Sequence, residues 1–166
     1  MNVLKPVDHA ALRTNQATII LLLLLAFILN VPLLVGLVAL IMLGGSVIFN
    51  KPGFGWVYTR GLRKLGWVKP DVLQDNREPH LFAQGFGGVF LVASIAALLG
   101  GAALAGWILL WIVIALAALN LFAGFCVGCA VYYLLHRIGV PGFVKEPPSG
   151  TLPGLRPHDS MPAQKS

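Results

Sequence analysis

Charged and apolar positions are segregated along this chain into long blocks. All 12 lysines and arginines and all 6 acidic residues fall in residues 1–16, 50–81 and 137–166. The two blocks between them, 17–49 and 82–136, hold no charged residue. Because burying a charge in lipid costs several kcal/mol, uncharged blocks of this length are typical of membrane-embedded segments. The pattern predicts an all-α membrane protein.

Four transmembrane helices in two hairpins fit these blocks. A helix needs about 20 residues to span about 30 Å of hydrocarbon. Asn30-Val31-Pro32 divides the first block, since Asn is a good cap and Pro is accepted only in the first turn of a helix. A single helix kinked at Pro32 is the alternative. The small residues Gly100-Gly101-Ala102-Ala103 divide the second block. We expect helices over about 15–29, 32–49, 80–99 and 106–137.

The charged segments indicate the topology. Both predicted hairpin tips lack charge, whereas every Lys and Arg lies in the N-terminus, the central loop 50–79 or the C-terminal segment. By the positive-inside rule these three segments face the cytoplasm, which predicts a multi-pass plasma-membrane protein with both termini cytoplasmic. The chain has a net charge of +6, and its lysines and arginines flank the apolar spans. That placement favours anionic lipid head groups over nucleic acid as its counterpart.

Two segments outside the spans are distinctive. The central loop interleaves aromatic residues with cations, which is typical of an amphipathic segment in the membrane interface. The tail 138–166 has six prolines (positions 141, 147, 148, 153, 157 and 162) and little apolar content. Alone it should be extended or disordered. We therefore predict a four-helix membrane domain, 1–137, followed by a Pro-rich tail. The predicted interface residues are Trp56, Arg60, Arg63, Lys64 and Trp67.

Cys126 and Cys129 are the only cysteines in the sequence and the sharpest candidates for chemistry. Three residues apart on a helix, they share one face, and a Cys-x-x-Cys pair can cycle between dithiol and disulfide. Within a helix over 106–137, however, the pair lies deep in apolar surroundings, where burial raises the pKa of a thiol and makes it inert. Two small packing residues are therefore the competing interpretation.

Other polar residues accompany the cysteines. Tyr132, Tyr133 and His136 continue the cysteine-bearing side of the helix toward the predicted cytoplasmic face. They suit either a proton path to water or an interfacial aromatic belt. We expect no metal site, because two thiolates need two more ligands and only His136, His80 or His9 is at hand.

Small residues predict close packing between the third and fourth helices. Gly-x-x-x-Gly spacing lets two helices approach closely, and an Asn can hydrogen-bond across such a contact. Alternatively, Asn120 lines a site at membrane depth. No acid, Lys or Arg lies in a span, which argues against a proton-coupled pump or a charged-substrate transporter. The facing sets are Asn120, Gly124 and Gly128 on the fourth helix and Ala93, Ala97 and Gly101 on the third.

Three separated motifs resemble a known family. They are Val7-Asp8-His9 with Arg13-x-Asn15-Gln16-Ala17, then Arg77-Glu78-Pro79-His80-Leu81-Phe82-Ala83-Gln84 with Gly87-Gly88-Val89-Phe90-Leu91, and finally Leu119-Asn120 with Gly124-Phe125-Cys126-x-Gly128-Cys129 and Tyr132. Over roughly residues 5–137 the chain resembles the uncharacterised bacterial membrane family catalogued as domain of unknown function 4395. The resemblance implies a multi-helix protein of the bacterial inner membrane with a Phe-Cys-x-Gly-Cys motif in its last helix. It implies no particular activity.

Three functional hypotheses follow. The first is an accessory or structural subunit of a larger bacterial membrane complex, which packs through its small-residue helix faces and the tail 138–166. The second is a membrane thiol–disulfide or sulfur-relay protein that uses Cys126 and Cys129; as an enzyme it would be a thiol–disulfide oxidoreductase. The third is a carrier of a small neutral solute. No cofactor is evident, and the expected partners are the lipid bilayer and other membrane proteins.

Overall fold

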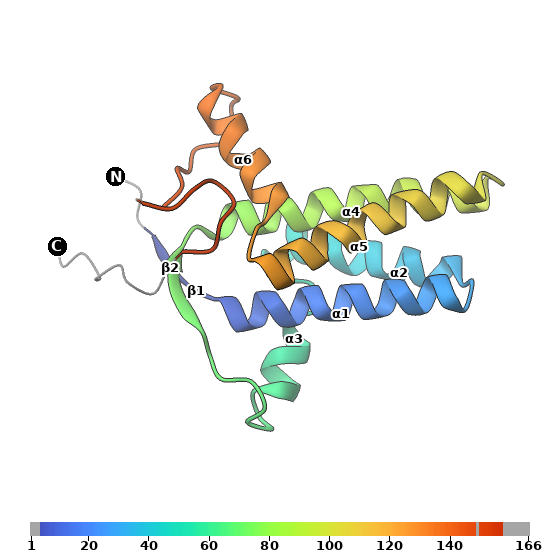
Figure 1. Ribbon diagram of the computed structural model, residues 1–166, viewed down its shortest axis with the longest axis horizontal. Coiled ribbons are helices and arrows are strands. Elements are labelled where there is room, and N and C mark those ends of the chain that lie inside the picture. Colours follow the sequence, from blue (N-terminus) through green and yellow to red (C-terminus); the bar gives the residue numbers. More distant parts are fainter. Residues whose placement is uncertain (1–3, 149, 158–166) are drawn as a thin grey trace.

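The computed structural model describes residues 4–148 and 150–157. Four helices lie side by side in an elongated bundle (Figure 1). The first two form one hairpin and the last two a second, and each hairpin packs along the other, since α2 contacts α4 and α1 contacts α5. A π-helical segment, Gly44–Ile48, extends the second helix. The four helices are α1 (His9–Ile28), α2 (Pro32–Leu43), α4 (Arg77–Leu99) and α5 (Ala103–Ala123).

Both predicted hairpins are present. In the first, Asn30 adopts a left-handed conformation with φ of 52°, and Pro32 begins α2, where its missing N–H costs nothing. The alternative of one long kinked helix is therefore wrong. The helix α1 begins at His9, earlier than predicted, because the Asp8 side chain caps it by accepting a hydrogen bond from the backbone of Ala10.

Three helices of the described chain, α1, α4 and α5, are long and apolar enough to cross a membrane. Only 22–28% of the residues in their most apolar stretches are buried inside the protein, so most of these apolar residues keep accessible surface that lipid could cover. The fourth predicted span, Pro32–Ile48, is apolar but shorter. Its full passage through the bilayer stays a prediction.

The predicted single helix over 106–137 is broken in the structure. The helix α5 ends at Ala123, Gly124 turns the chain with φ of +65°, and a separate helix, α6 (Val127–Arg137), leaves the bundle at a steep angle (Figure 1). Glycine at the residue after a helix is favoured because it adopts this left-handed conformation without a Cβ clash. Gly124 is thus a helix terminator and not the packing residue that its spacing predicted.

Ser94 and Gly106, which the small-residue pattern did not predict, make a close contact between α4 and α5. The Ser94 hydroxyl donates a hydrogen bond to the Gly106 carbonyl at 2.7 Å. A Cβ on Gly106 would lie 2.9 Å from the Ser94 carbonyl oxygen, so only glycine permits this approach. Ala93 is exposed, and Gly101 lies in the turn between the two helices.

The charged end of the bundle is closed by short elements. Strands β1 (Lys5–Asp8) and β2 (Val72–Asp75) pair antiparallel, with Lys5 opposite Asp75. The tail returns to this end, and within its described residues Leu155 forms a β-bridge with Phe125. The predicted extended or disordered tail is therefore held against the domain over this stretch, while residues 158–166 lie outside the described chain.

A short helical segment projects from the side of the bundle (Figure 1). It comprises α3 (Gly55–Val57) and a π-helical turn, Tyr58–Leu62. Phe54 and Tyr58 are buried and fasten it to the bundle. All five predicted interface residues lie on its outer side or just after it and are exposed, an arrangement that suits contact with a membrane surface.

Candidate redox site

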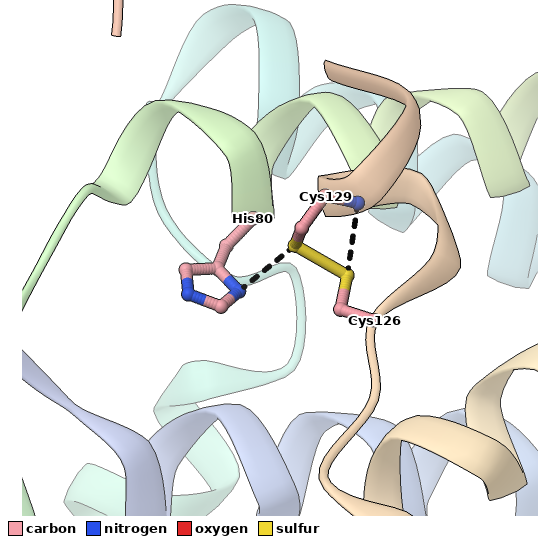
Figure 2. Close-up of side chains that lie close together, drawn as sticks. All are labelled: His80, Cys126 and Cys129. Atoms are coloured by element: carbon pink, nitrogen blue, oxygen red, sulfur yellow. Dashed lines mark hydrogen bonds between the residues drawn. A yellow bond between two sulfur atoms is a disulfide. The ribbon is translucent and has the colours of Figure 1, made fainter. Parts of the chain in front are cut away.

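Cys126 and Cys129 are joined by a disulfide at the start of α6 (Figure 2). Cys126 has extended backbone angles and is the N-cap residue of the helix. Its sulfur accepts a hydrogen bond from the backbone N–H of Cys129 at 3.2 Å. The prediction that the pair lies deep within a helix is therefore wrong, because the break at Gly124 places it at a helix N-terminus. There the helix dipole and unpaired N–H groups favour a thiolate.

His80 lies beside the disulfide and comes from the first turns of α4 (Figure 2). Its Nδ1 atom is 3.4 Å from the sulfur of Cys129. Its Nε2 atom is 2.9 Å from Oδ2 of Asp75, the last residue of β2. Since both ring nitrogens are engaged, the ring is fixed in orientation. The Cys129 sulfur, the His80 imidazole and the Asp75 carboxylate thus form one continuous chain of contacts.

A second histidine shares the same carboxylate. His9 Nε2 lies 3.2 Å from Asp75 Oδ2, although not in hydrogen-bonding geometry. Burial alone would raise the pKa of Asp75, but the contacts with His80 and His9 outweigh burial and hold its pKa well below the ordinary value of 3.8. Asp75 is therefore a carboxylate at any physiological pH and supplies a buried negative charge to both rings.

The sheet explains why these residues meet. His9 directly follows β1, and its backbone N–H donates to the carbonyl of Asp71, just before β2. The pairing sets Lys5 opposite Asp75 and Asp8 opposite Val72, so the His9 backbone lies at the other end of β2 and its side chain reaches back to the Asp75 carboxylate. After Asp75 the chain turns directly into α4, with His80 in its first turns. His9 and the segment from Asp75 to His80, which are distant in sequence, therefore converge beside the cysteines.

A cavity of about 790 Å³ opens beside the disulfide at this end of the bundle. Both cysteines, both histidines and Asp75 line it, together with the cations Arg13 and Arg156. Asn120 lines this cavity and also a smaller one of about 60 Å³ that reaches Cys126 from the bundle interior. The alternative that Asn120 faces a site therefore fits better than a role in helix packing.

The tail forms one wall of the cavity. The backbone N–H of Cys126 donates to the Gly154 carbonyl at 2.7 Å, and the N–H of Arg156 donates to the Gly124 carbonyl at 3.0 Å. The Arg156 guanidinium also forms an ion pair with Asp71. This strap, residues 150–157, thus lies directly along the turn that carries the disulfide.

The remaining predicted residues of α6 play supporting roles. Gly128 packs against Ala83 of α4, where a Cβ would lie 2.5 Å from the Ala83 Cβ. Burial raises the pKa of Tyr133 to about 12, so this phenol stays protonated. His136 Nδ1 lies 2.7 Å from the carbonyl oxygen of Phe143, away from the disulfide. The predicted proton path through His136 is therefore not the arrangement seen, since His80 is the imidazole in contact with Cys129.

Sequence reasoning had considered His9 and His80 only as possible metal ligands, and it missed Asp75 altogether. One local feature pointed to His80 as a site residue: it follows Pro79, which is typical of the first turn of a helix, so His80 was expected near a helix start. The pairing of β1 with β2, which brings the segment before His9 alongside the segment before His80, could not be read from four-residue strands.

The comparison with known proteins identifies the family. A family model described as Domain of unknown function (DUF4395) matches residues 7–137. Since this match covers most of the chain, the protein belongs to that family. No curated protein and no solved structure matches it.

Proposed function

We propose that this member of the domain-of-unknown-function family DUF4395 is a membrane-bound thiol–disulfide oxidoreductase with Cys126 and Cys129 as its reactive pair. The observation that carries the proposal is the disulfide at the N-terminus of α6, in contact with the His80–Asp75 pair. A helix N-terminus stabilises a thiolate, and an adjacent imidazole can exchange a proton with a thiol. Cysteines that serve only to pack need neither feature.

Exchange would proceed in two displacement steps. A partner thiolate attacks the Cys126 sulfur, the Cys126–Cys129 bond breaks, and Cys129 leaves as a thiolate that takes a proton from the protonated His80. A second partner thiolate then attacks the partner's sulfur in the mixed disulfide. Cys126 leaves as a thiolate at the helix N-terminus. The partner loses two electrons and forms a disulfide, while the protein gains both electrons and holds the Cys129 thiol and the Cys126 thiolate, which becomes a thiol when it takes up a proton from water. The reverse sequence oxidises the protein.

Access and charge favour a water-soluble thiol protein or thiol compound as the partner. Cys126 is 6% and Cys129 3% exposed, so a partner reaches them through the 790 Å³ cavity. That cavity opens at the end of the bundle where the cation-rich segments gather. By the positive-inside rule we expect this end to face the cytoplasm, and we therefore propose that exchange occurs on the cytoplasmic side of the bacterial inner membrane.

The accessory-subunit hypothesis draws less support from the same observations. It relied on small-residue faces and the tail being free for partners. Gly128 instead packs against Ala83 of the same chain. The strap 150–157 is likewise bonded to the domain through the backbones of Gly124 and Cys126. Partner binding through these surfaces would first require them to separate from the chain.

Thiol trapping on the full chain tests the proposal. The protein, in native membranes and in mild detergent, is equilibrated with glutathione redox buffers, quenched in acid and alkylated with a mass-adding maleimide. We expect a reversible two-thiol transition. With a disulfide substrate, the lone Cys126 thiolate of Cys129→Ser should displace one sulfur of the substrate and accumulate as a mixed disulfide. His80→Asn should slow exchange of the wild-type pair by about 10²-fold or more. His136→Asn is the matched control and should leave the rate within about twofold.

Cysteines that stay reduced and unreactive in every buffer would refute the proposal. Equal rates for His80→Asn and His136→Asn would show that the contact with Cys129 has no part in exchange.

A further inference from the structure

Three soft or borderline metal ligands meet at the disulfide. The sulfurs of Cys126 and Cys129 and the Nδ1 atom of His80 all lie within 4.8 Å of one another. A tetrahedral zinc ion holds thiolate sulfur at about 2.3 Å and imidazole nitrogen at about 2.0–2.1 Å, which places the two ligand atoms about 3.5 Å apart. The observed separation between the Cys129 sulfur and His80 Nδ1 is 3.4 Å. One ligand pair is therefore already at coordination spacing.

We propose that the reduced protein binds one zinc ion through Cys126, Cys129 and His80, with the fourth position open to the cavity. When the disulfide is reduced, the sulfurs move apart to non-bonded contact, near the spacing of about 3.8 Å that two thiolates have on zinc. Binding then replaces two thiol protons by one ion: Zn²⁺ plus two thiols gives a zinc dithiolate and two released protons. Neither electrons nor an oxidant are required, and the inference does not depend on exchange activity.

The surroundings of His80 are those of a metal-bound histidine. Such a ring almost always donates its other N–H to a carboxylate or carbonyl, which fixes the tautomer and points the free lone pair at the metal. Here Nε2 faces the Asp75 carboxylate at 2.9 Å, so Nδ1 is left to face the cysteines. The N–H of Cys129 already donates to the Cys126 sulfur and would stabilise it as a thiolate ligand.

Charge and space also suit the ion. Two thiolates balance the charge of Zn²⁺, so the bound site is neutral, as burial of both cysteines requires. The cavity of about 790 Å³ gives the ion an entry path and leaves room for a water molecule or a substrate atom as fourth ligand. Three protein ligands with one open position are the arrangement of catalytic rather than structural zinc sites.

A neighbouring cluster competes for the same ring. His9, Asp75 and His80 also bring three ligand atoms within 4.8 Å of one another. In that cluster the Asp75 oxygen already contacts both rings, and an ion there would have to displace these contacts. Binding through Cys126, Cys129 and His80 Nδ1 leaves the Asp75 contacts with both rings in place, and thiolate is a softer and stronger ligand for zinc than carboxylate. The cysteine variants below distinguish the two sites.

Zinc binding is tested on the purified full chain in detergent. The protein is reduced with a phosphine reductant, which supplies no competing thiol, and is then given zinc sulfate, passed through a desalting column and assayed for metal. We expect about one zinc per reduced chain and none on the oxidised chain. The double variant Cys126→Ser with Cys129→Ser should hold none, and His80→Asn should bind at least tenfold more weakly. His136→Asn should bind normally.

Cobalt provides a second readout that does not depend on the stability of any variant. Co²⁺ added to the reduced wild-type chain should give a thiolate-to-cobalt charge-transfer band and the intense visible bands of a tetrahedral site. Zinc that binds equally to the double serine variant, or cobalt without a thiolate band, would overturn the proposal in favour of the His9–Asp75–His80 cluster. Absence of zinc from the reduced wild-type chain would overturn it outright.

Discussion

Replacing Gly128 with alanine tests whether the packing of α6 on α4 positions the cysteines. Gly128 lies in the first turn of α6, between the two cysteines in sequence. A Cβ at this position would lie 2.5 Å from the Cβ and 2.7 Å from the Cα of Ala83. The opposing Cα belongs to a helix backbone and cannot rotate away, so the two helices must separate.

The size of the effect follows from these distances. Carbon atoms rest about 3.5–4.0 Å apart, so α6 must retreat by about 1 Å at this contact. Overpacking of this kind costs about 1–3 kcal/mol of the free energy of unfolding. The same shift lengthens the 3.4 Å contact between Cys129 and His80. Since misplacing a reacting group by about 1 Å can cost about 10²-fold in rate, we expect exchange to slow by about 10- to 100-fold.

Two measurements on the purified protein in detergent check this expectation: thermal unfolding followed by helical circular dichroism, and the rate of disulfide exchange with a soluble dithiol. Gly44→Ala is the matched control, because Gly44 is also helical and no atom lies within 4 Å of its Cβ position. It should change stability by less than about 0.5 kcal/mol. Ala83→Gly should restore Gly128→Ala only in part, since the Ala83 Cα remains in the way. Wild-type stability and rate for Gly128→Ala would refute the reasoning.

Three further predictions follow from other positions. Gly124→Ala should lower the free energy of unfolding by about 1–2 kcal/mol, because φ of +65° disfavours any residue with a Cβ, and Gly124→Asn should cost less in the same denaturation assay. The Asp75 carboxylate has a depressed pKa, so the stability it contributes is fully present above about pH 4 and is lost as the pH falls toward its folded-state value. Melting temperatures measured from pH 6 to 3 should therefore fall for the wild type, whereas Asp75→Asn should be less stable at pH 6 and should show a smaller fall. Gln84→Met should cost about 2–4 kcal/mol on chemical unfolding, because the Gln84 amide bonds buried groups of three other segments at once; equal stability of this variant would show that water replaces the amide.

The bundle was predictable because its signals are local. Uncharged blocks of 33 and 55 residues (17–49 and 82–136) favour helices long enough to cross lipid, and Pro32 suits the first turn of a helix but disrupts its interior. The charged segments predicted that the N-terminus, the central loop and the C-terminal segment lie at the same end of the two hairpins. Each of these signals is read within a few residues, so no knowledge of distant contacts was needed.

The break at Gly124 was not predictable from the same kind of signal. A glycine four residues before another glycine satisfies a helix-packing motif and a helix terminator equally well. What decides between them is the contact of the following turn with the strap, including the hydrogen bond from Arg156 N–H to the Gly124 carbonyl. That contact joins positions more than 30 residues apart. The interpretation of the cysteines changed with it, from the middle of a helix to its first turn.

The residues around the disulfide were hidden for a related reason. His80 and Cys129 are 49 positions apart in sequence, and only the packing of α6 against α4 makes them neighbours. Asp75 carried no motif of its own. The site combines the end of a strand (Asp75), the start of one helix (His80) and the cap of another (Cys126). Residues placed in this way have no common periodicity in the sequence.

The position of the disulfide at one end of the bundle bears on whether the protein could transfer electrons across a bilayer. The chain has two cysteines, both at that end, and α4 alone extends about 34 Å away from them at 1.5 Å per residue. The sequence has no further cysteine along this length or at the hairpin tips that could accept electrons from the Cys126–Cys129 pair. Under the proposed exchange, electrons that enter through the cavity are expected to leave on the same side of the bundle, because both cysteines lie together there. In this proposal the helices hold the reactive pair at one membrane surface and carry no electrons across the bilayer.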